Sequence, residues 1–532
     1  MRQTTLVTLD ELPLGKCPVQ VGLFCAEDAG EAGGELGRGE GQRNGTGSAG
    51  HSSGAGAKLV GGRGAEAILR MSGIDIAHLA AQAPGFTGAV GQSQTIVVSA
   101  ADASRTTFVV IGLGAQKAFD ATALRDASAR SAGGQRSLFA TTLALELDAD
   151  GDSAVRAVVE GIGLGGYRYQ AAGVQQTGAE QHDPAALIVT SQVVSDSVVR
   201  RARVFADAAN WVRQLVETPS SVLGPVEFAA AITAHAAAVA AGAVTVSVWS
   251  RDQLSERGFA GTLGVGAGSD REPCVVELST AGVGAPIALA GKGITFDSGG
   301  INLKKDPGEL AWMKSDMAAG AAVAAAVIAA AALGAAVPMT ALVPVAENMP
   351  GGGALRPGDV LTHPDGRTTE VVDTDCEGRL VLADAVAWLA KSAPRALIDV
   401  GTLTDSGGVG PALWGCWGTA PALAAEMVDA GVRAGEPGWQ LPLVPSYAGL
   451  LPSIVADAAN APRDVPDSGQ LAATFLRPFA GSTPWLHIDN GSGAYLEHDF
   501  SPWPAGATGS PVRALIEFLC SPTLADAFVL DT

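Results

Sequence analysis

An apolar run followed at once by a charged, glycine-bearing segment sets the strongest constraint on this sequence. Residues 285–290 read APIALA, and residues 291–316 read GKGITFDSGGINLKKDPGELAWMKSD. A short run of apolar side chains predicts a strand buried on both faces, as in parallel sheets covered by helices. In open α/β sheets, ligand sites form beyond the carboxyl ends of the strands. Lys292 and Asp297 fall at that position, so we expect this edge of the sheet to carry the chemistry.

A second charged segment, residues 373–380, reads DTDCEGRL. Residues 368–375 are predicted to be extended, and successive side chains of an extended segment point to opposite sides. Asp375, Glu377 and Arg379 therefore share one side if that geometry continues. Two carboxylates beside an arginine suit a hard divalent cation and an anion. A surface loop with an ion pair has the same pattern, so this segment alone leaves both interpretations open.

The two segments together predict a metal site. They carry four acidic residues, Asp297, Asp316, Asp375 and Glu377. A like-charge pair at about 4 Å costs roughly 4 kcal/mol at an effective dielectric near 20, so converging carboxylates need compensation. Two divalent cations would balance the four charges. The 7 histidines show no HExxH spacing, so a zincin-type helix is not predicted. A carboxylate-rich two-metal site is the coherent alternative.

Length and composition set the broad class. A chain of 532 residues is too long for one compact core, so two domains are expected. The formal net charge of −20 argues against a nucleic-acid partner, because phosphate binding needs a cationic face. The 6 cysteines are scattered, which indicates reduced thiols. The first residues lack the apolar core of a signal peptide, so cytoplasmic localisation is expected.

Alternating strand and helix patterns predict an α/β fold with two domains. Residues 1–192 are expected to form a smaller N-terminal α/β domain, in which residues 28–56 are a flexible Gly-rich tract. Residues 193–532 are expected to form a connector helix, at 195–216, and a larger catalytic domain with a mixed, mostly parallel sheet. The catalytic-domain strands are predicted at 244–249, 274–278, 287–290, 339–345, 396–402 and 485–488, and the helices at 226–241, 317–333 and 380–391.

Two segments have an alternative interpretation. Residues 317–337 contain no charged side chain and are long enough to cross a bilayer. They are mostly alanine and glycine, and no aromatic belt flanks them, so a buried core helix is predicted and no membrane association is expected. Residues 112–114, GLG, resemble the start of a dinucleotide fingerprint, but Lys117 stands at the third glycine position. A plain strand-to-helix turn is predicted there instead.

Several ordered motifs resemble the leucyl (cytosol) aminopeptidase family, which includes bacterial aminopeptidase A. The resemblance covers roughly residues 213–488. It implies a metal-dependent aminopeptidase that releases leucine and other mainly apolar residues from peptides with a free N-terminus. It also implies a homohexamer arranged as a dimer of trimers. The motifs are GKGITFDSGG at 291–300, MKSD at 313–316, AENMP at 346–350, RPGDV at 356–360 and DTDCEGRLVLADA at 373–385.

The resemblance also implies a ligand set for two divalent ions per subunit, Mn²⁺ or Zn²⁺. Lys292, Asp297, Asp316 and Glu377 match the ligands of one ion, and Asp297, Asp375 and Glu377 match those of the other. Only a neutral lysine amine can bind a metal, so burial and the adjacent cations must lower its pKa. The alternative for Lys292 is an ion pair with one of these acids.

Other matched positions are implied to act on the substrate. Lys304 matches a catalytic lysine that polarises the scissile carbonyl. Arg379 matches a residue that holds a bicarbonate ion, which is thought to act as general base. Met313 matches a residue near the pocket for the first side chain, although core packing is an equal alternative. Thr402 and Leu403 match positions that contact the substrate.

Some residues depart from the family pattern. Cys376 stands in place of a usual alanine and Asp373 in place of a usual asparagine. Asp405 stands in place of a glycine near the pocket, and its charge is expected either to favour basic N-terminal residues or to lower activity.

Two other functions share these residues. A family member without strong activity, with a structural or DNA-binding role, would keep the motifs as vestiges. A two-metal phosphoesterase would use the carboxylates but leave Lys292 and the ordered motifs unexplained.

Overall fold

The structure is a computed structural model of the 532-residue chain. It describes residues 195–500 and 503–525 and, before them, 4–7, 19–25, 59–61, 63–89, 92–99, 105–115, 120–134, 141–145, 151–171 and 185–189. The predicted flexible tract, residues 28–56, lies outside the described residues. The chain divides into one unit of residues 1–167 with 177–203 and a second unit of residues 168–176 with 204–532.

The first unit is built on a 7-stranded sheet, counted over its described residues. Its strands run in the order β1-β7-β6-β2-β5-β4, with β3 paired to β2. The pairs β1–β7, β7–β6, β6–β2 and β2–β5 are parallel. Strand β4 pairs with β5, and β3 pairs with β2, both antiparallel. The strands are β1 (Thr4–Val7), β2 (Val19–Cys25), β3 (Leu59–Gly61), β4 (Ser93–Ser99), β5 (Arg105–Ala115), β6 (Thr141–Leu145) and β7 (Ala185–Val189).

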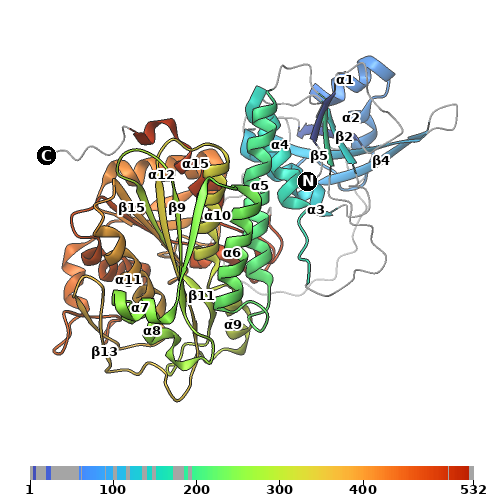
Figure 1. Cartoon of the computed structure of the whole chain (residues 1–532). Coiled ribbons are helices and arrows are strands. Elements are labelled where there is room, and N and C mark those ends of the chain that lie inside the picture. The colour runs from blue at the N-terminus through green and yellow to red at the C-terminus, as the bar shows by residue number, and fades with distance from the viewer. Residues whose placement is uncertain are drawn as a thin grey trace, which may run out of the picture. The chain divides into compact units, whose positions relative to one another are not determined.

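Strand β5 supplies side chains to two hydrophobic cores, because alternate residues of a strand face opposite sides. Val109 and Ile111 pack with helices α3 (Ala121–Gly134) and α4 (Gly151–Gly165). Phe108 and Val110 pack with α1 (Arg63–Ser72) and α2 (Ile76–Ala81). The sheet is therefore covered by helices on both faces (Figure 1).

The GLG sequence at residues 112–114 lies inside β5. The predicted strand-to-helix turn is therefore wrong at this position. The strand continues because Gly112 and Ala115 pair with Leu23 and Cys25 of the neighbouring strand β2, with a shift in register between them. A Cβ on Gly112 would come within 2.2 Å of the Ala89 carbonyl oxygen, so a close backbone contact accounts for this glycine.

The second unit contains a 9-stranded sheet, again counted over described residues, in the order β17-β16-β19-β15-β10-β12-β9-β8 with β11 paired to β12. Its central strands β19, β15, β10 and β12 are parallel, and β9, β8 and β16 join antiparallel. This confirms the predicted mixed, mostly parallel sheet. The strands are β8 (Val244–Trp249), β9 (Cys274–Thr280), β10 (Ile287–Gly291), β11 (Gly293–Asp297), β12 (Met339–Asn348), β15 (Ala396–Gly401), β16 (Trp414–Gly418), β17 (Gly438–Gln440) and β19 (Trp485–Asp489).

Helices cover both faces of this sheet (Figure 1). One layer contains α6 (Pro225–Val239), α10 (Ala318–Ala332), α12 (Pro421–Ala434) and α15 (Val512–Leu519). The other contains α8 (Ala260–Val265), α11 (Glu377–Ala390) and α13 (Gly469–Leu476). Such two-sided cover explains why residues 287–291 of β10 are all buried and apolar in sequence.

Helix α10 is the apolar segment that resembled a membrane span. By length and composition the helical stretch 307–332 could cross a bilayer, but 89% of its apolar window is buried inside the unit. Residues 318–330 are all buried against the sheet and the neighbouring helices. Small alanine side chains let a helix pack closely on every side, which is the arrangement predicted for a core helix.

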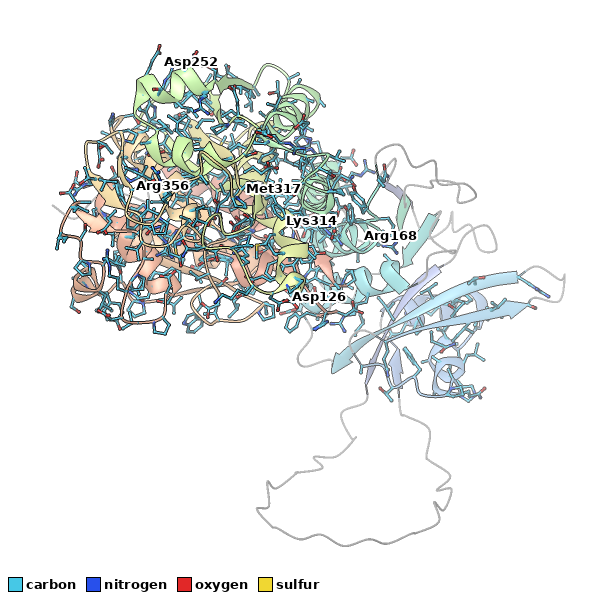
Figure 2. All side chains as sticks on the ribbon, turned by 90° about the horizontal axis from the view of Figure 1, so that it is seen from below. Asp126, Arg168, Asp252, Lys314, Met317 and Arg356 are labelled. Carbon is cyan, nitrogen blue, oxygen red and sulfur yellow. The ribbon has the colours of Figure 1, made fainter. Side chains whose placement is uncertain are left out.

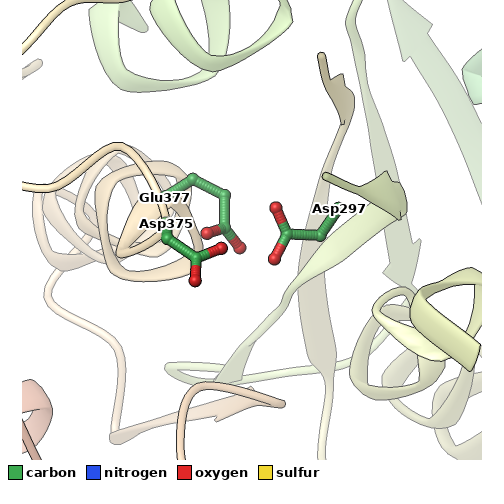
Figure 3. Close-up of side chains that lie close together, drawn as sticks. All are labelled: Asp297, Asp375 and Glu377. Atoms are coloured by element: carbon green, nitrogen blue, oxygen red, sulfur yellow. The ribbon is translucent and has the colours of Figure 1, made fainter. Parts of the chain in front are cut away.

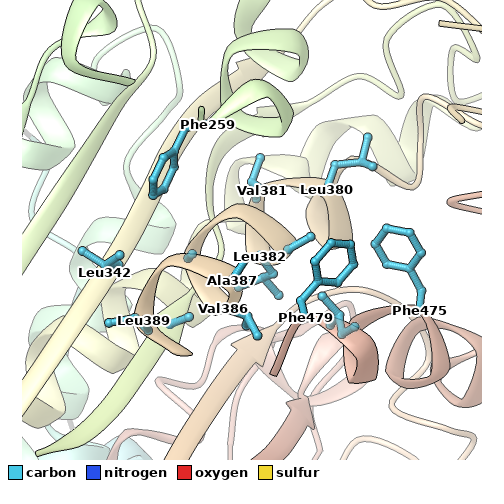
Figure 4. Close-up of a cluster of buried hydrophobic side chains, with 14 of the residues drawn as sticks. Phe259, Leu342, Leu380, Val381, Leu382, Val386, Ala387, Leu389, Phe475 and Phe479 are labelled. Atoms are coloured by element: carbon cyan, nitrogen blue, oxygen red, sulfur yellow. The ribbon is translucent and has the colours of Figure 1, made fainter. Parts of the chain in front are cut away.

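A hydrophobic core of this unit surrounds α11 (Figure 4). Leu380, Val381 and Leu382 of α11 pack with Phe475 and Phe479 from the α13 region and with side chains of the central strands. This packing fixes the first turn of α11 against the sheet. Glu377 lies in that first turn, and Asp375 lies two residues before it.

Helix α5 (Asp196–Glu217) is the predicted connector. The division between the two units falls within it, between Arg203 and Val204. Its apolar residues Phe205, Ala209 and Val212 are fully buried, in agreement with their helical spacing in the sequence.

Candidate metal centre

The acids and lysines of the first charged segment lie at the carboxyl ends of central strands. Lys292 directly follows β10, Asp297 is the last residue of β11, and Thr402 directly follows β15. Parallel strands end at the same edge of a sheet, so residues distant in sequence meet there. This edge is the one at which the sequence analysis expected the chemistry.

The turn after β11 fixes the Asp297 carboxylate. Its Oδ1 accepts hydrogen bonds from the Asn348 amide, at 2.8 Å, and from the Gly299 backbone N–H, at 2.9 Å. Gly299 and Gly300 have φ angles of +86° and +64°, in the left-handed region that favours glycine. A Cβ on Gly299 would also lie 2.9 Å from Asp375 Oδ1. The paired glycines therefore allow the backbone to pass close to the second charged segment.

The second charged segment is extended over a shorter range than predicted. Strand β14 spans only Thr368–Glu370, and Asp375 lies in a turn before α11, which begins at Glu377. The prediction that residues 368–375 are extended is therefore wrong beyond Glu370. The turn is set by hydrogen bonds from the backbone to side chains, described below. Glu377 and Arg379 project from the first helical turn and not from a strand.

Three carboxylates from the two segments converge (Figure 3). Asp297, Asp375 and Glu377 each offer an oxygen atom within 4.8 Å of the other two. Glu377 is 1% exposed and Asp297 is 3% exposed, so water screens their charges poorly. A group of this size and composition can hold a divalent cation.

Lys292 joins this group to Asp316. Its Nζ lies 2.7 Å from Glu377 Oε1 and 2.8 Å from Asp316 Oδ1. Burial acts to lower the pKa of Lys292, but the charges of Asp316, Glu377 and Asp297 raise it by more, so its pKa lies above the ordinary value and the amine carries a proton here. The same nitrogen donates a hydrogen bond to the Thr402 carbonyl oxygen at 2.9 Å.

Lys304 approaches the carboxylates from the loop after the paired glycines. Its Nζ lies 2.9 Å from Asp297 Oδ2 and 2.6 Å from Asp375 Oδ1. Burial lowers its pKa, and Asp297, Glu377 and Asp375 together raise it by more. The neighbouring Lys305 is exposed.

Asp316, Asp375 and Glu377 have pKa values above those of free carboxyl groups. Burial, assisted by the charges of Asp297 and Glu377, raises the pKa of Asp375 to about 8, although Lys304 acts in the opposite direction. Burial also raises the pKa of Asp316 and the pKa of Glu377. These shifts show that the two lysines compensate the acids only in part.

Two buried ligand-type oxygens at this centre, Asp316 Oδ2 and Glu377 Oε2, have neither a hydrogen-bond partner nor an ion-pair contact among the described residues. Buried carboxylate oxygens without partners are costly unless a cation binds them. The set of carboxylate oxygens and one amine therefore fits divalent metal ions.

The substrate-side residues lie around the same centre. Thr402 Oγ1 donates a hydrogen bond to Asp316 Oδ1 at 2.7 Å, and Leu403 is half-buried. A Cβ on Gly378 would lie 2.6 Å from both a Leu403 methyl carbon and Lys292 Nζ, so a larger residue there would displace these side chains. Met313 is buried in the short helix before Asp316.

Lys314 anchors the segment that carries Asp316. Its Nζ lies 2.9 Å from the Glu217 carboxylate and donates a second bond to the Glu217 carbonyl oxygen. Figure 2 shows Lys314 and Met317 near each other along this segment. This ion pair holds the segment against the end of α5 and so helps to fix the position of Asp316, which lies two residues before α10.

Arg379 is buried, and its guanidinium group forms an ion pair with Asp467. Its Nη1 donates hydrogen bonds to the Asn460 carbonyl oxygen at 2.8 Å and to Asp467 Oδ1 at 3.1 Å. Its Nη2 donates to Asp467 Oδ2. Arg379 Nε is buried with no hydrogen-bond partner among the described residues.

Several side chains that position the site have no role predicted from the sequence. Asn460, fully buried, accepts hydrogen bonds from the Val372 and Asp373 backbone N–H groups and donates to the Asp373 and Cys376 carbonyl oxygens. Asn348 spans Asp297 and the Thr374 carbonyl oxygen. Asn348 lies in the AENMP motif, which could have drawn attention to it. Asn460 and Asp467 carry no such signal.

Two family models match the chain. Residues 210–516 match a model described as the catalytic domain of the cytosol aminopeptidase family. Residues 67–172 match the N-terminal domain of the same family. The catalytic match includes every candidate ligand named above.

Named relatives are similar over most of their length. A probable cytosol aminopeptidase of Micrococcus luteus is 41% identical over 74% of this chain and 80% of its own. One from Picosynechococcus sp. is 34% identical over 85% of this chain and 92% of its own. Among solved structures, the bottromycin maturation enzyme BotP in complex with Mn has a TM-score of 0.73 and 35% identity, covering 82% of this chain and 94% of that one.

Proposed function

The chain belongs to the cytosol aminopeptidase family and is a metal-dependent peptidase, and we propose that it releases leucine and other mainly apolar residues from peptides with a free N-terminus. One observation carries this proposal. Lys292, Asp297, Asp316, Asp375 and Glu377 lie in a single connected group with unpartnered oxygen atoms. A hydrolase that activates water with cations needs such a group.

The residues present fit two divalent ions per subunit, Mn²⁺ or Zn²⁺. Lys292, Asp297, Asp316 and Glu377 would hold one ion, and Asp297, Asp375 and Glu377 the other. When bound, such ions polarise a carbonyl group and lower the pKa of water toward neutrality. The unpartnered oxygens of Glu377 and Asp316 support this assignment.

The chain's own residues are assigned to the remaining tasks. Lys304, whose ammonium is held by Asp297 and Asp375, is placed to donate to the oxygen of the scissile carbonyl as negative charge develops there. Arg379 would hold a bicarbonate ion, as the family resemblance implies. When bound, that ion would supply a general base beside the attacking water.

Met313, Thr402 and Leu403 are proposed to contact the first side chain of the substrate. Thr402 and Leu403 follow β15 beside Lys292, and Met313 lies three residues before Asp316. Leu403 offers an apolar surface next to the metal ligands. Burial of an apolar side chain there favours leucine-like residues.

We propose a cytoplasmic homohexamer, a dimer of trimers. The relatives are described as cytosol aminopeptidases, which supports that compartment. A structural or DNA-binding role is disfavoured by the net charge of −20 and by the intact ligand group. A phosphoesterase role leaves the buried Lys292 unexplained.

Hydrolysis of leucine p-nitroanilide tests the proposal. We expect turnover that a chelator abolishes and that Mn²⁺ or Zn²⁺ restores. N-acetyl-leucine p-nitroanilide is the matched control, because it lacks the free amine and should resist cleavage. Chelator-insensitive turnover, or no turnover after metal loading, would overturn the assignment.

A further inference from the structure

Arg379 and Asp467 form an ion pair whose role in the reaction can be inferred if the function proposed above holds. Arg379 is 1% exposed and Asp467 is 28% exposed. A guanidinium withdrawn from water needs a nearby anion, because an uncompensated buried charge is strongly unfavourable. Both Asp467 oxygens bond to Arg379, one through each terminal nitrogen. The chain therefore supplies the anion itself.

We propose that Asp467 is the resident anion of Arg379, that it occupies the place otherwise taken by bicarbonate, and that the reaction needs no dissolved bicarbonate. A carboxylate and a bicarbonate ion share a single negative charge and a planar pair of oxygens, which is the shape a guanidinium fork accepts. An anion from solution would have to displace a group that is covalently attached to the chain. In this scheme the Asp467 carboxylate is the general base that bicarbonate would otherwise supply at Arg379.

The surroundings of Asp467 support a built contact. Arg379 Nη1 also donates a hydrogen bond to the Asn460 carbonyl oxygen at 2.8 Å, so the guanidinium group is held by Asn460 as well as by Asp467. Cys376 Sγ lies 3.5 Å from Asp467 Oδ2 and is the other side chain that bonds to Asp467. Asp467 lies two residues before α13, whose residues Leu471 and Phe475 are buried in the core. The packing of α13 in the core therefore restricts the position of the Asp467 carboxylate.

The test compares wild type with Asp467→Ala, Asp467→Asn and the control Asp464→Ala, an exposed acid of the same segment. Leucine p-nitroanilide hydrolysis is measured on metal-loaded protein in buffer stripped of carbon dioxide and then with added bicarbonate or formate. We expect wild type and Asp464→Ala to be unaffected by these anions. Asp467→Ala should lose about 100-fold in kcat and regain most of it on addition of either anion. Asp467→Asn, which fills the space without a charge, should regain much less.

A second measurement does not depend on turnover. Binding of ¹³C-bicarbonate, followed by NMR line broadening, should be saturable for Asp467→Ala and absent for wild type. Metal content and circular dichroism establish that each variant is folded and loaded. If Asp467→Ala does not fold, the wild-type measurements alone, of turnover with added anion and of ¹³C-bicarbonate binding, test whether bicarbonate is used.

The inference is overturned if bicarbonate stimulates the wild type several-fold, if wild type binds ¹³C-bicarbonate, or if Asp467→Ala keeps full activity without added anion. These outcomes are distinct from failure of the proposed function. A wild type that never cleaves leucine p-nitroanilide contradicts the aminopeptidase assignment, whereas the NMR comparison still decides whether Asp467 takes the anion place.

Discussion

Lys292 Nζ lies 2.7 Å from Glu377 Oε1, and this contact joins the two sequence segments that carry the candidate metal ligands. The same nitrogen reaches Asp316 and the carbonyl oxygen of Thr402. One buried amine therefore bonds to Glu377, Asp316 and Thr402, which lie in three separate parts of the chain. Its protonated state satisfies the acids when no metal is bound, and its neutral state can bind a metal.

Substitution of Lys292 distinguishes a metal ligand from an ion-pair partner. Lys292→Met should reduce bound metal from two ions to about one per subunit and lower kcat/KM by about 100-fold or more. Lys292→Arg keeps the charge but offers no neutral nitrogen, so it should show the same loss. Metal content by mass spectrometry and kinetics on leucine p-nitroanilide measure both. Two bound ions with normal activity in Lys292→Arg would leave Lys292 as an ion-pair residue only.

Metal affinity should increase with pH. Metal binding displaces protons from Lys292, whose pKa is raised above its ordinary value, and from Asp375, whose pKa is about 8. Protons compete at low pH, so each proton displaced makes the dissociation constant fall about tenfold per pH unit. Calorimetry in buffers of different ionisation enthalpy measures the protons released. A dissociation constant that is the same at about pH 6.5 and about pH 8.5 would contradict this linkage.

Lys304→Met should bind metal yet lose most turnover. The substitution removes the ammonium that lies between Asp297 and Asp375, so metal affinity should be unchanged or higher. Loss of a donor to developing negative charge should lower kcat by about 100- to 1,000-fold. Lys305→Met, next in sequence and exposed, is the control and should keep wild-type kinetics. Full turnover in Lys304→Met would remove this residue from the mechanism.

Asn460→Ala should weaken both stability and metal binding. The side chain makes hydrogen bonds to the backbone of residues 372–376 and is fully buried, so its loss leaves buried groups unpaired. We expect the free energy of unfolding to fall by about 2 kcal/mol, measured by urea denaturation. Asn490→Ala, another fully buried asparagine, should lower stability without lowering metal affinity. Equal metal affinity in wild type and Asn460→Ala would show that the turn holds its shape without this side chain.

Asp405→Gly should reduce the preference for basic N-terminal residues. Asp405 is exposed, and its Oδ1 accepts a hydrogen bond from the Gly407 backbone N–H at 3.1 Å. An exposed charge pair contributes up to about 1 kcal/mol, so the ratio of arginine to leucine anilide kcat/KM should fall by about fivefold. Asp405→Asn keeps that hydrogen bond without the charge and should give the same fall. Ratios that match the wild type in both variants would dispose of the hypothesis.

Local sequence patterns were sufficient for most elements of the catalytic unit. Residues 287–290 were predicted as a strand and form most of β10, and the predicted helix at 317–333 is α10. Apolar runs and helical spacing carry this information because burial acts on each residue separately. The same patterns failed at residues 371–375, where side chains distant in sequence set a turn.

By itself the sequence determined the α/β class, the two charged segments and the residue types that two cations would require, because these follow from hydrophobic period and charge. Only the tertiary structure decided that Asn460 shapes the turn before α11 and that Asp467 is bonded to Arg379. The physical reason is that both contacts link residues more than eighty positions apart, through side-chain hydrogen bonds that leave no periodic trace in the chain. Such contacts are fixed by how helices and strands pack, which no local pattern encodes.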